Sequence, residues 1–222
     1  MALPHFEAVI LDLDGLILDT EPTYARAWQQ AARELGFDLS DSLCQSLKGC
    51  HIEAVQNQLQ QAFGPDFDIP AFHDLSTRLW RQWVEAHGIA TKPGYRELMD
   101  FLKNAQIPYA LATNSQRQYA EKCMALADIL DDFPLTVTRD EVASGKPAPD
   151  IYLQAAKMLG TPPVHCLAVE DSGPGILAAH QAGTKPVLIP DSAPVACEIE
   201  ALAIATLPSL ESLVSQLTAK FP

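Results

Sequence analysis

The chain has 222 residues, of which 48% are hydrophobic and 19% charged, a balance typical of a folded globular protein with a substantial core. Its formal net charge of −13 disfavours nucleic acid and anionic membranes as partners, because both expose negative phosphates. The five cysteines include no Cys-x-x-Cys pair, which argues against a disulfide framework or zinc site and favours a reducing cytoplasm, and no apolar run is long enough to span a membrane.

Segments typical of strands and of helices alternate along most of the chain. Short buried strands are predicted at 8–13, 109–113, 135–138, 166–169 and 186–189, with a weaker one near 202–207. Helices are predicted between most of these strands, at 94–103, 116–130, 149–159 and 173–182. The alternation predicts an α/β fold, a Rossmann-like doubly wound parallel sheet with helices on both faces.

The segment from Glu21 to about Thr91 differs, because it contains no convincing strand. Helix-period apolar faces run through it, and glycine and proline residues separate them. An all-helical block inserted after the first strand of an α/β core suggests a lid, with hinges at 15–20 and 88–93. We therefore expect an α/β core and an inserted helical cap domain, formed by residues 1–15 with 93–222 and by residues 16–92.

Asp12 and Asp14 close the first predicted strand, and Gly15 allows a sharp turn directly after them. Residues two apart in an extended strand face the same way, so both carboxylates are expected on one side. Two anions at the end of a buried strand are costly unless a cation lies between them. The pair therefore predicts a metal site, and one of the acids could also attack an electrophile.

Three further polar clusters follow predicted strands. Thr113 and Asn114 offer a hydroxyl group and the backbone N–H groups at the start of a helix, which could bind an anion. Lys146 supplies a cation. Glu170 and Asp171 form a second acid pair, directly before a helix that begins with glycine. Ligands of open parallel sheets bind at the carboxyl ends of the strands. We therefore expect all four clusters to converge at one edge.

This ordered set resembles the haloacid-dehalogenase (HAD) superfamily of phosphotransferases over essentially the whole chain. The family pattern of Asp-x-Asp-Gly, a hydroxyl residue, a lysine and an acid pair is matched by Asp12/Asp14, Thr113, Lys146 and Glu170/Asp171. Three sequence segments are similar to those of the branch with a helical cap after the first strand, known as subfamily I. They are Asp-Gly-Leu-Ile-Leu-Asp-Thr-Glu, Gly-Lys-Pro-Ala-Pro-Asp-Ile-Tyr and Glu-Asp-Ser-Gly-Pro-Gly-Ile. That branch includes sugar-phosphate and nucleotide phosphatases and β-phosphoglucomutase.

The resemblance implies a role for each core residue. Asp12 would attack phosphorus and form an aspartyl-phosphate, and Asp14 would protonate the leaving alcohol and then deprotonate water. Thr113 and Asn114 would hold phosphoryl oxygens, and Lys146 would offset negative charge. Mg²⁺ would bind the Asp12 carboxylate, the Asp14 backbone carbonyl and Asp171, with Glu170 as a further ligand or a neighbour of one.

The resemblance also points to substrate-binding residues. Gly15, Asn114 and Glu21 are expected to contact substrate. Lys48 and His51 lie in the cap loop through which family members recognise their substrates. The alternative, to which we give equal weight, is that both residues belong to a solvated loop without a role in binding.

The leading hypothesis is a cytoplasmic, Mg²⁺-dependent phosphatase of a small phosphomonoester, such as a sugar or nucleoside phosphate. We expect a monomer, although the oligomeric state stays open. A β-phosphoglucomutase-like phosphotransferase is the first alternative: residues 45–49 resemble that enzyme's cap loop, but Tyr24 stands where it has a histidine and Glu21 fits the phosphatases. Asp14 argues against dehalogenase and phosphonate-cleaving activities, and an inactive HAD-fold binding protein is the second alternative.

Overall fold

The computed structural model describes residues 3–47, 52–191 and 195–220. The chain divides into two compact units, Met1–Leu18 with Ala90–Pro222, and Asp19–Ile89. Each unit is described by itself. None of the helices in the described residues combines the length and hydropathy that crossing a membrane requires.

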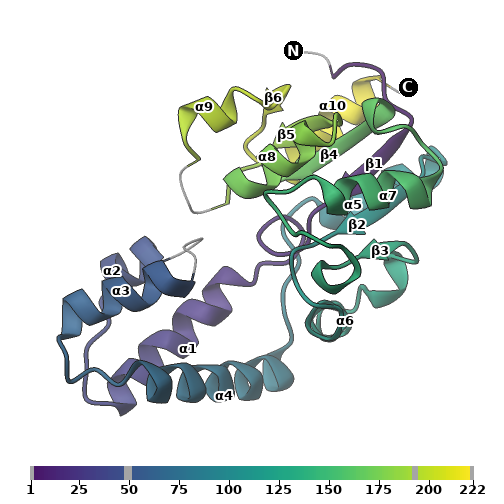
Figure 1. Ribbon diagram of the computed structural model, residues 1–222. Coiled ribbons are helices and arrows are strands. Elements are labelled where there is room, and N and C mark those ends of the chain that lie inside the picture. The colour runs from purple at the N-terminus through teal and green to yellow at the C-terminus, as the bar shows by residue number, and fades with distance from the viewer. Residues whose placement is uncertain (1–2, 48–51, 192–194, 221–222) are drawn as a thin grey trace. The chain divides into compact units, whose positions relative to one another are not determined.

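The first unit is built on a parallel sheet of six strands in the order β3-β2-β1-β4-β5-β6. The sequence order runs outward in both directions from β1, which confirms the predicted doubly wound α/β fold (Figure 1). The strands are β1 (Ala8–Leu11), β2 (Tyr109–Ala112), β3 (Thr136–Val137), β4 (Cys166–Glu170), β5 (Lys185–Leu188) and β6 (Ala205–Thr206).

The central strand β1 is buried along its whole length. Ile10 pairs with Ala110 of β2 on one side and with Ala168 of β4 on the other. A strand covered on both faces must be apolar at successive positions, which explains why the sequence shows a continuous hydrophobic run there. The chain reverses its direction of travel across the sheet between β1 and β4, the position where open sheets bind ligands.

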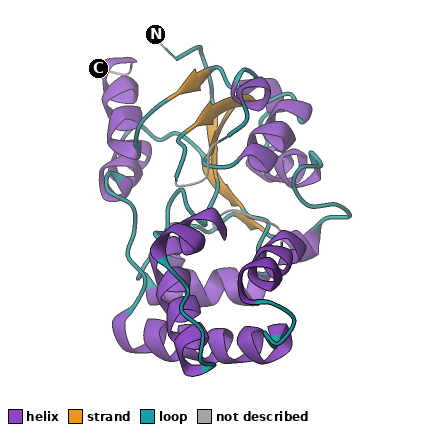
Figure 2. Cartoon of the chain, turned by 90° about the vertical axis from the view of Figure 1, so that its left-hand side faces the viewer, coloured by secondary structure: helices purple, strands orange, loops and turns teal. Residues whose placement is uncertain are grey.

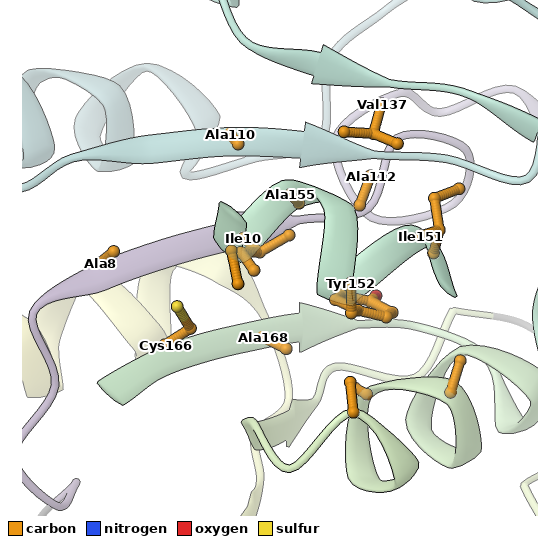
Figure 3. Packing of buried hydrophobic residues seen from close by; sticks show 14 residues of the cluster. Ala8, Ile10, Ala110, Ala112, Val137, Ile151, Tyr152, Ala155, Cys166 and Ala168 are labelled. Atoms are coloured by element: carbon orange, nitrogen blue, oxygen red, sulfur yellow. The ribbon is translucent and has the colours of Figure 1, made fainter. Parts of the chain in front are cut away.

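Helices α7 (Asp150–Leu159) and α8 (Gly173–Gln181) cover one face of the sheet. Figure 3 shows the alternate β1 residues Ala8 and Ile10 in this layer, with Ile10 beside Ala155 and Tyr152 of α7. Many of the buried residues here are alanines, which lets these helices lie close to the strands. Helices α5 (Tyr95–Asn104) and α10 (Leu210–Lys220) pack together on the opposite face, and Figure 2 shows the sheet with helices on both sides.

Several short elements differ from the sequence-based expectation. The helix predicted over 116–130 is α6 (Arg117–Leu126); it ends before Asp128, whose φ of 57° is left-handed, and the 3₁₀ turn η1 (Leu130–Asp132) follows. The 3₁₀ turns η2 (Arg139–Glu141) and η3 (Pro163–His165), the short helix α9 (Cys197–Glu200), and α10 were not predicted.

The second unit contains α1 (Glu21–Glu34), α2 (Asp41–Leu47), α3 (Ile52–Phe63) and α4 (Ile69–His87). Within residues 19–47 and 52–89 it has no strand, so the inserted block is all-helical as predicted. Helices α1 and α4 pack together: Trp80 Nε1 donates to Thr23 Oγ1 at 2.9 Å, and the Tyr24 and Trp80 rings stack with centroids 5.1 Å apart.

Two chain segments connect the units, and they run side by side within the first unit. Lys92 N donates to Ile17 O at 2.7 Å, and Leu18 forms an antiparallel bridge with Thr91. Gly15 precedes the outgoing segment with a φ of +87°, a left-handed conformation that favours glycine.

Candidate active site

The carboxyl ends of β1, β2 and β4 bring the predicted polar residues together. Asp12 follows β1, Thr113 follows β2, and Glu170 ends β4 with Asp171 directly after it. The strands are in register, since Leu11 pairs with both Leu111 and Val169, so these polar residues emerge at the same edge. All are at least partly buried, which gives their charges strong mutual influence.

Lys146 reaches this edge from the loop before α7. Its Nζ bonds to Asp12 Oδ1 and Glu170 Oε1, and it donates to the carbonyl of Ala112 at 3.0 Å. The lysine backbone is also fixed, because its N–H donates to Asn114 Oδ1 at 2.9 Å. With its side chain only 4% exposed, Lys146 is a buried cation held between two buried acids.

Glu170 has hydrogen-bond partners on both carboxylate oxygens. Oε1 accepts from Tyr152 OH at 2.5 Å in addition to Lys146, and Oε2 accepts from Ser172 Oγ at 3.1 Å. Sequence analysis missed Tyr152. A buried tyrosine on the inner face of a predicted helix needs a partner for its hydroxyl, and that signal could have pointed to a polar neighbour.

The carboxylates of Asp12, Glu170 and Asp171 form a group of potential metal ligands. One oxygen from each lies within 4.8 Å of the others. If all three acids are ionised, they and Lys146 together carry a net charge of −2, which one divalent cation would neutralise. Oxygen donors are what Mg²⁺ prefers, so the donor set fits that ion.

The burial and close packing of these charged groups shift their pKa values. Burial raises the pKa of Asp12 to about 8; Lys146 opposes this rise and Glu170 adds to it. Burial, with the charges of Asp12 and Glu170, also holds the pKa of Asp171 well above its usual range. For Lys146 burial acts to lower the pKa, but the two carboxylates outweigh it and raise the pKa.

These shifts predict how the metal-free protein responds to pH. Because the folded pKa values of Asp12 and Asp171 exceed the unfolded value of about 4, the folded state holds more protons and loses stability as pH rises from about 4 through 8. Mg²⁺ would replace those protons, so the increase in Tm that it causes should be larger near pH 8 than near pH 5. Thermal unfolding with EDTA or Mg²⁺ at both pH values measures this, and equal shifts would contradict it.

Two glycines allow the acids to pack tightly. A Cβ on Gly15 would lie 2.2 Å from Asp171 Oδ2, and a Cβ on Gly175 would lie about 2 Å from the Glu170 carboxylate. Neither separation is possible between real atoms. Both positions therefore require glycine for space, in addition to the backbone conformation at Gly15.

Replacing Gly175 with alanine should lower the free energy of unfolding by about 1–3 kcal/mol, because the new methyl group displaces the Glu170 carboxylate. Gly173→Ala on the same helix is the matched control, since its Cβ would meet nothing closer than 3.8 Å. Urea denaturation of both variants is the measurement. Equal effects on stability would show that helix propensity, and not the crowding of Glu170, determines the change.

Asp14 lies outside the three-acid group, and its side chain has different partners. Its Oδ2 accepts from Ser115 Oγ at 2.8 Å, and its Oδ1 accepts from Tyr119 OH at 3.3 Å. Strand β1 ends at Leu11, so the alternation expected of an extended strand does not extend to this residue. Sequence analysis did not identify these two contacts.

The remaining predicted residues are placed as follows. Thr113 is buried and its Oγ1 accepts from Ser115 N at 3.1 Å. Glu21 begins α1 in the helical unit. Lys48 and His51 lie outside the described residues.

One ion pair near the site was not anticipated. Lys92 Nζ lies 2.5 Å from Asp191 Oδ1, and both side chains are largely buried. Asp191 Oδ2 lies 3.7 Å from the Cβ position of Gly15, so this pair borders the turn after Asp14.

Comparisons with known proteins agree on one family. A family model described as haloacid dehalogenase-like hydrolase matches residues 6–183. The chain is 31% identical to a phosphorylated carbohydrates phosphatase of Thermotoga maritima over 181 residues, which cover 80% of this chain and 82% of that protein. It is 33% identical to the β-phosphoglucomutase of Bacillus subtilis over 183 residues, covering 80% of each chain.

A solved structure shows the same architecture. The crystal structure of a HAD family hydrolase from Deinococcus radiodurans, with bound phosphate and sodium, matches with a TM-score of 0.81 and 28% identity. The match covers 96% of this chain and 98% of that one.

Proposed function

The chain belongs to the haloacid dehalogenase-like hydrolase family, and from this premise we propose a magnesium-dependent phosphatase that acts on a small phosphomonoester. Family membership and relatives named as phosphatases identify a phosphoric monoester hydrolase. The proposal adds the metal, the covalent intermediate and the substrate class, a sugar phosphate or nucleoside phosphate. The carbohydrate phosphatase of Thermotoga maritima favours a phosphorylated sugar.

The chemistry assigned to the chain has two steps. In the first, a carboxylate oxygen of Asp12 attacks phosphorus, the bond from phosphorus to the substrate oxygen breaks, and Asp14 gives a proton to the departing oxygen. In the second, Asp14 takes a proton from water, the water oxygen attacks phosphorus, and the bond to Asp12 breaks. Inorganic phosphate and the free alcohol leave, and both aspartates return to their starting states.

The other residues hold charge during these steps. Lys146 holds Asp12 in place and offsets negative charge on the phosphoryl group, while Thr113 and Asn114 are assigned to its oxygens. Mg²⁺ would be held by Asp12, Asp171 and the backbone carbonyl of Asp14, with Glu170 beside it, and would supply positive charge to the transferring group.

The substrate's alcohol is assigned to other parts of the chain. We place Gly15, Glu21, Lys48 and His51 on the substrate side, with the unit Asp19–Ile89 as cap and the other unit as catalytic core. We propose a cytoplasmic monomer; the four cysteines in the described part of the chain are free thiols.

One observation carries the proposal: a buried lysine bonds two acids at the carboxyl edge of a parallel sheet, with a third acid beside them. Burying these charges is costly, and charge stabilisation during catalysis is a function that can account for the cost. The arrangement therefore favours an enzyme over an inactive scaffold.

The test is phosphate release from a panel of phosphorylated sugars, nucleotides and p-nitrophenyl phosphate. We expect turnover with Mg²⁺, a preference for one class of small substrate, and loss of activity with EDTA that added Mg²⁺ restores. Absence of phosphate release from every member, by protein that is folded and loaded with Mg²⁺, would refute the proposal.

A β-phosphoglucomutase-like phosphotransferase is the second candidate, because the chain is 33% identical to the Bacillus subtilis enzyme of that name. Incubation with β-glucose 1-phosphate separates the two functions. Faster appearance of glucose 6-phosphate than of free phosphate would favour the mutase. Free phosphate as the main product would favour the phosphatase.

A further inference from the structure

Both carboxylate oxygens of Asp14 accept hydrogen bonds from hydroxyl groups, but the two hydrogen bonds differ in length. Ser115 Oγ lies 2.8 Å from Oδ2, close to the most common length for hydrogen bonds between oxygens. Tyr119 OH lies 3.3 Å from Oδ1, which is longer than usual and therefore weak. Of these two contacts, the one from Ser115 to Oδ2 is therefore the stronger.

The two hydroxyl groups are themselves held by the fold. Ser115 N donates to Thr113 Oγ1 at 3.1 Å, and Ser115 O accepts from Arg139 N at 3.0 Å, which fixes its backbone between the end of β2 and the turn η2. Tyr119 lies in the first turn of α6, whose inner face is buried through Ala120, Cys123 and Met124. The backbone positions from which both hydroxyl groups reach Asp14 are therefore fixed by the fold.

We propose that Ser115 and Tyr119 are positioning residues for Asp14, with Ser115 anchoring Oδ2 and Tyr119 holding Oδ1 until the leaving oxygen of the substrate replaces it. The inference rests on the proposed function, in which Asp14 protonates that oxygen. The closer bond, to Oδ2, fixes the direction of the carboxyl group. Oδ1, once Tyr119 no longer holds it, faces the leaving oxygen and is the atom through which Asp14 gives its proton as the bond from that oxygen to phosphorus breaks.

If Ser115 and Tyr119 position Asp14, replacing them should affect the proton transfer from Asp14 and not the other parts of the reaction. A poor leaving group needs the proton from Asp14, whereas a good one departs as an anion and needs it little. Loss of positioning should therefore slow only reactions with poor leaving groups. General damage to the site would slow all of them alike.

The experiment compares phenyl phosphate with p-nitrophenyl phosphate, which have the same ring but different leaving groups. Phenolate is the poorer one, with a conjugate-acid pKa of about 10, like tyrosine. For Ser115→Ala we expect kcat/KM with phenyl phosphate to fall about tenfold, and with p-nitrophenyl phosphate by less than about twofold. Tyr119→Phe should show the same selectivity with a smaller loss, because its bond is longer.

Two controls keep the result specific. Ser115→Thr retains the hydroxyl and should restore most of the rate with phenyl phosphate. Tyr109→Phe removes a phenol hydroxyl from β2 in the same unit and should change neither substrate's rate. The quantity kcat/KM is suitable because it reports only the steps through departure of the leaving group.

The outcomes are distinguishable. A fall of equal size with both substrates in Ser115→Ala, or no fall with either, would overturn the positioning role while the wild-type activity upholds the phosphatase. If the wild-type protein releases phosphate from neither substrate, the proposed function fails, and the role of Ser115 and Tyr119 fails with it.

Discussion

Asp12→Asn should reduce phosphate release by at least about 10⁴-fold, because an amide cannot attack phosphorus to form the covalent intermediate. The same substitution should leave the free energy of unfolding unchanged or raise it near pH 8. Burial raises the pKa of Asp12 to about 8, which means that its charge is unfavourable in the fold, and asparagine removes that charge. Loss of activity with retained stability is therefore the expected combination.

Phosphate release from the best substrate and urea denaturation, measured on the same preparation, test this prediction. Asp131→Asn makes the same chemical change at an exposed position after α6 and should alter neither quantity. Activity of Asp12→Asn within about tenfold of the wild type would show that another residue is the nucleophile.

Lys146→Met should lower the free energy of unfolding by about 3–5 kcal/mol at neutral pH, because it leaves two buried carboxylates without their cation. It should also reduce phosphate release by at least about 10²-fold through loss of charge stabilisation. Methionine keeps the length and apolar character of the lysine stem, so the charge is the main difference.

Lys103→Met is the matched control for this variant. Lys103 Nζ lies 2.6 Å from Asp132 Oδ1, but its side chain is 48% exposed, whereas that of Lys146 is 4% exposed. Because Lys103 is half exposed and Asp132 keeps its bonds to Tyr95 and Arg96, removal of the Lys103 charge should cost less than about 1 kcal/mol. Equal costs in urea denaturation would mean that burial of the charges at the site has no energetic consequence.

Much of the fold follows from residue patterns that act locally. A strand covered on both faces must be continuously apolar, and β1, β2 and β4 are found at or within one or two residues of the ends predicted. The helix α6 ends earlier than predicted because Asp128 takes a left-handed conformation that hydropathy does not encode. The final helix α10 could have been predicted from Leu210, Leu213 and Leu217, which repeat at helical spacing and are buried.

The convergence of the site was predictable because parallel strands end at a common edge. Asp12, Lys146 and Glu170 are in contact although they are far apart in the sequence. The hydrogen-bond partners of the acids were harder to predict from the sequence. Tyr152 and Tyr119 contact acids on other elements, and which hydroxyl reaches which acid depends on how α7 and α6 pack, which local patterns do not specify.

The pairing of the two connecting segments has a consequence for how such a chain can change. Because Lys92 N bonds to Ile17 O, the polypeptide departs from the sheet and returns to it at adjacent points. The roughly seventy residues between these points form one long loop. The entropic cost of closing such a loop grows only with the logarithm of its length, so changing the number of residues in it changes that cost little. We therefore expect insertions, deletions or complete exchange of Asp19–Ile89 to leave the strand order of the other unit intact. If Asp19–Ile89 is the cap, as proposed, a new specificity could then arise by replacing this one unit.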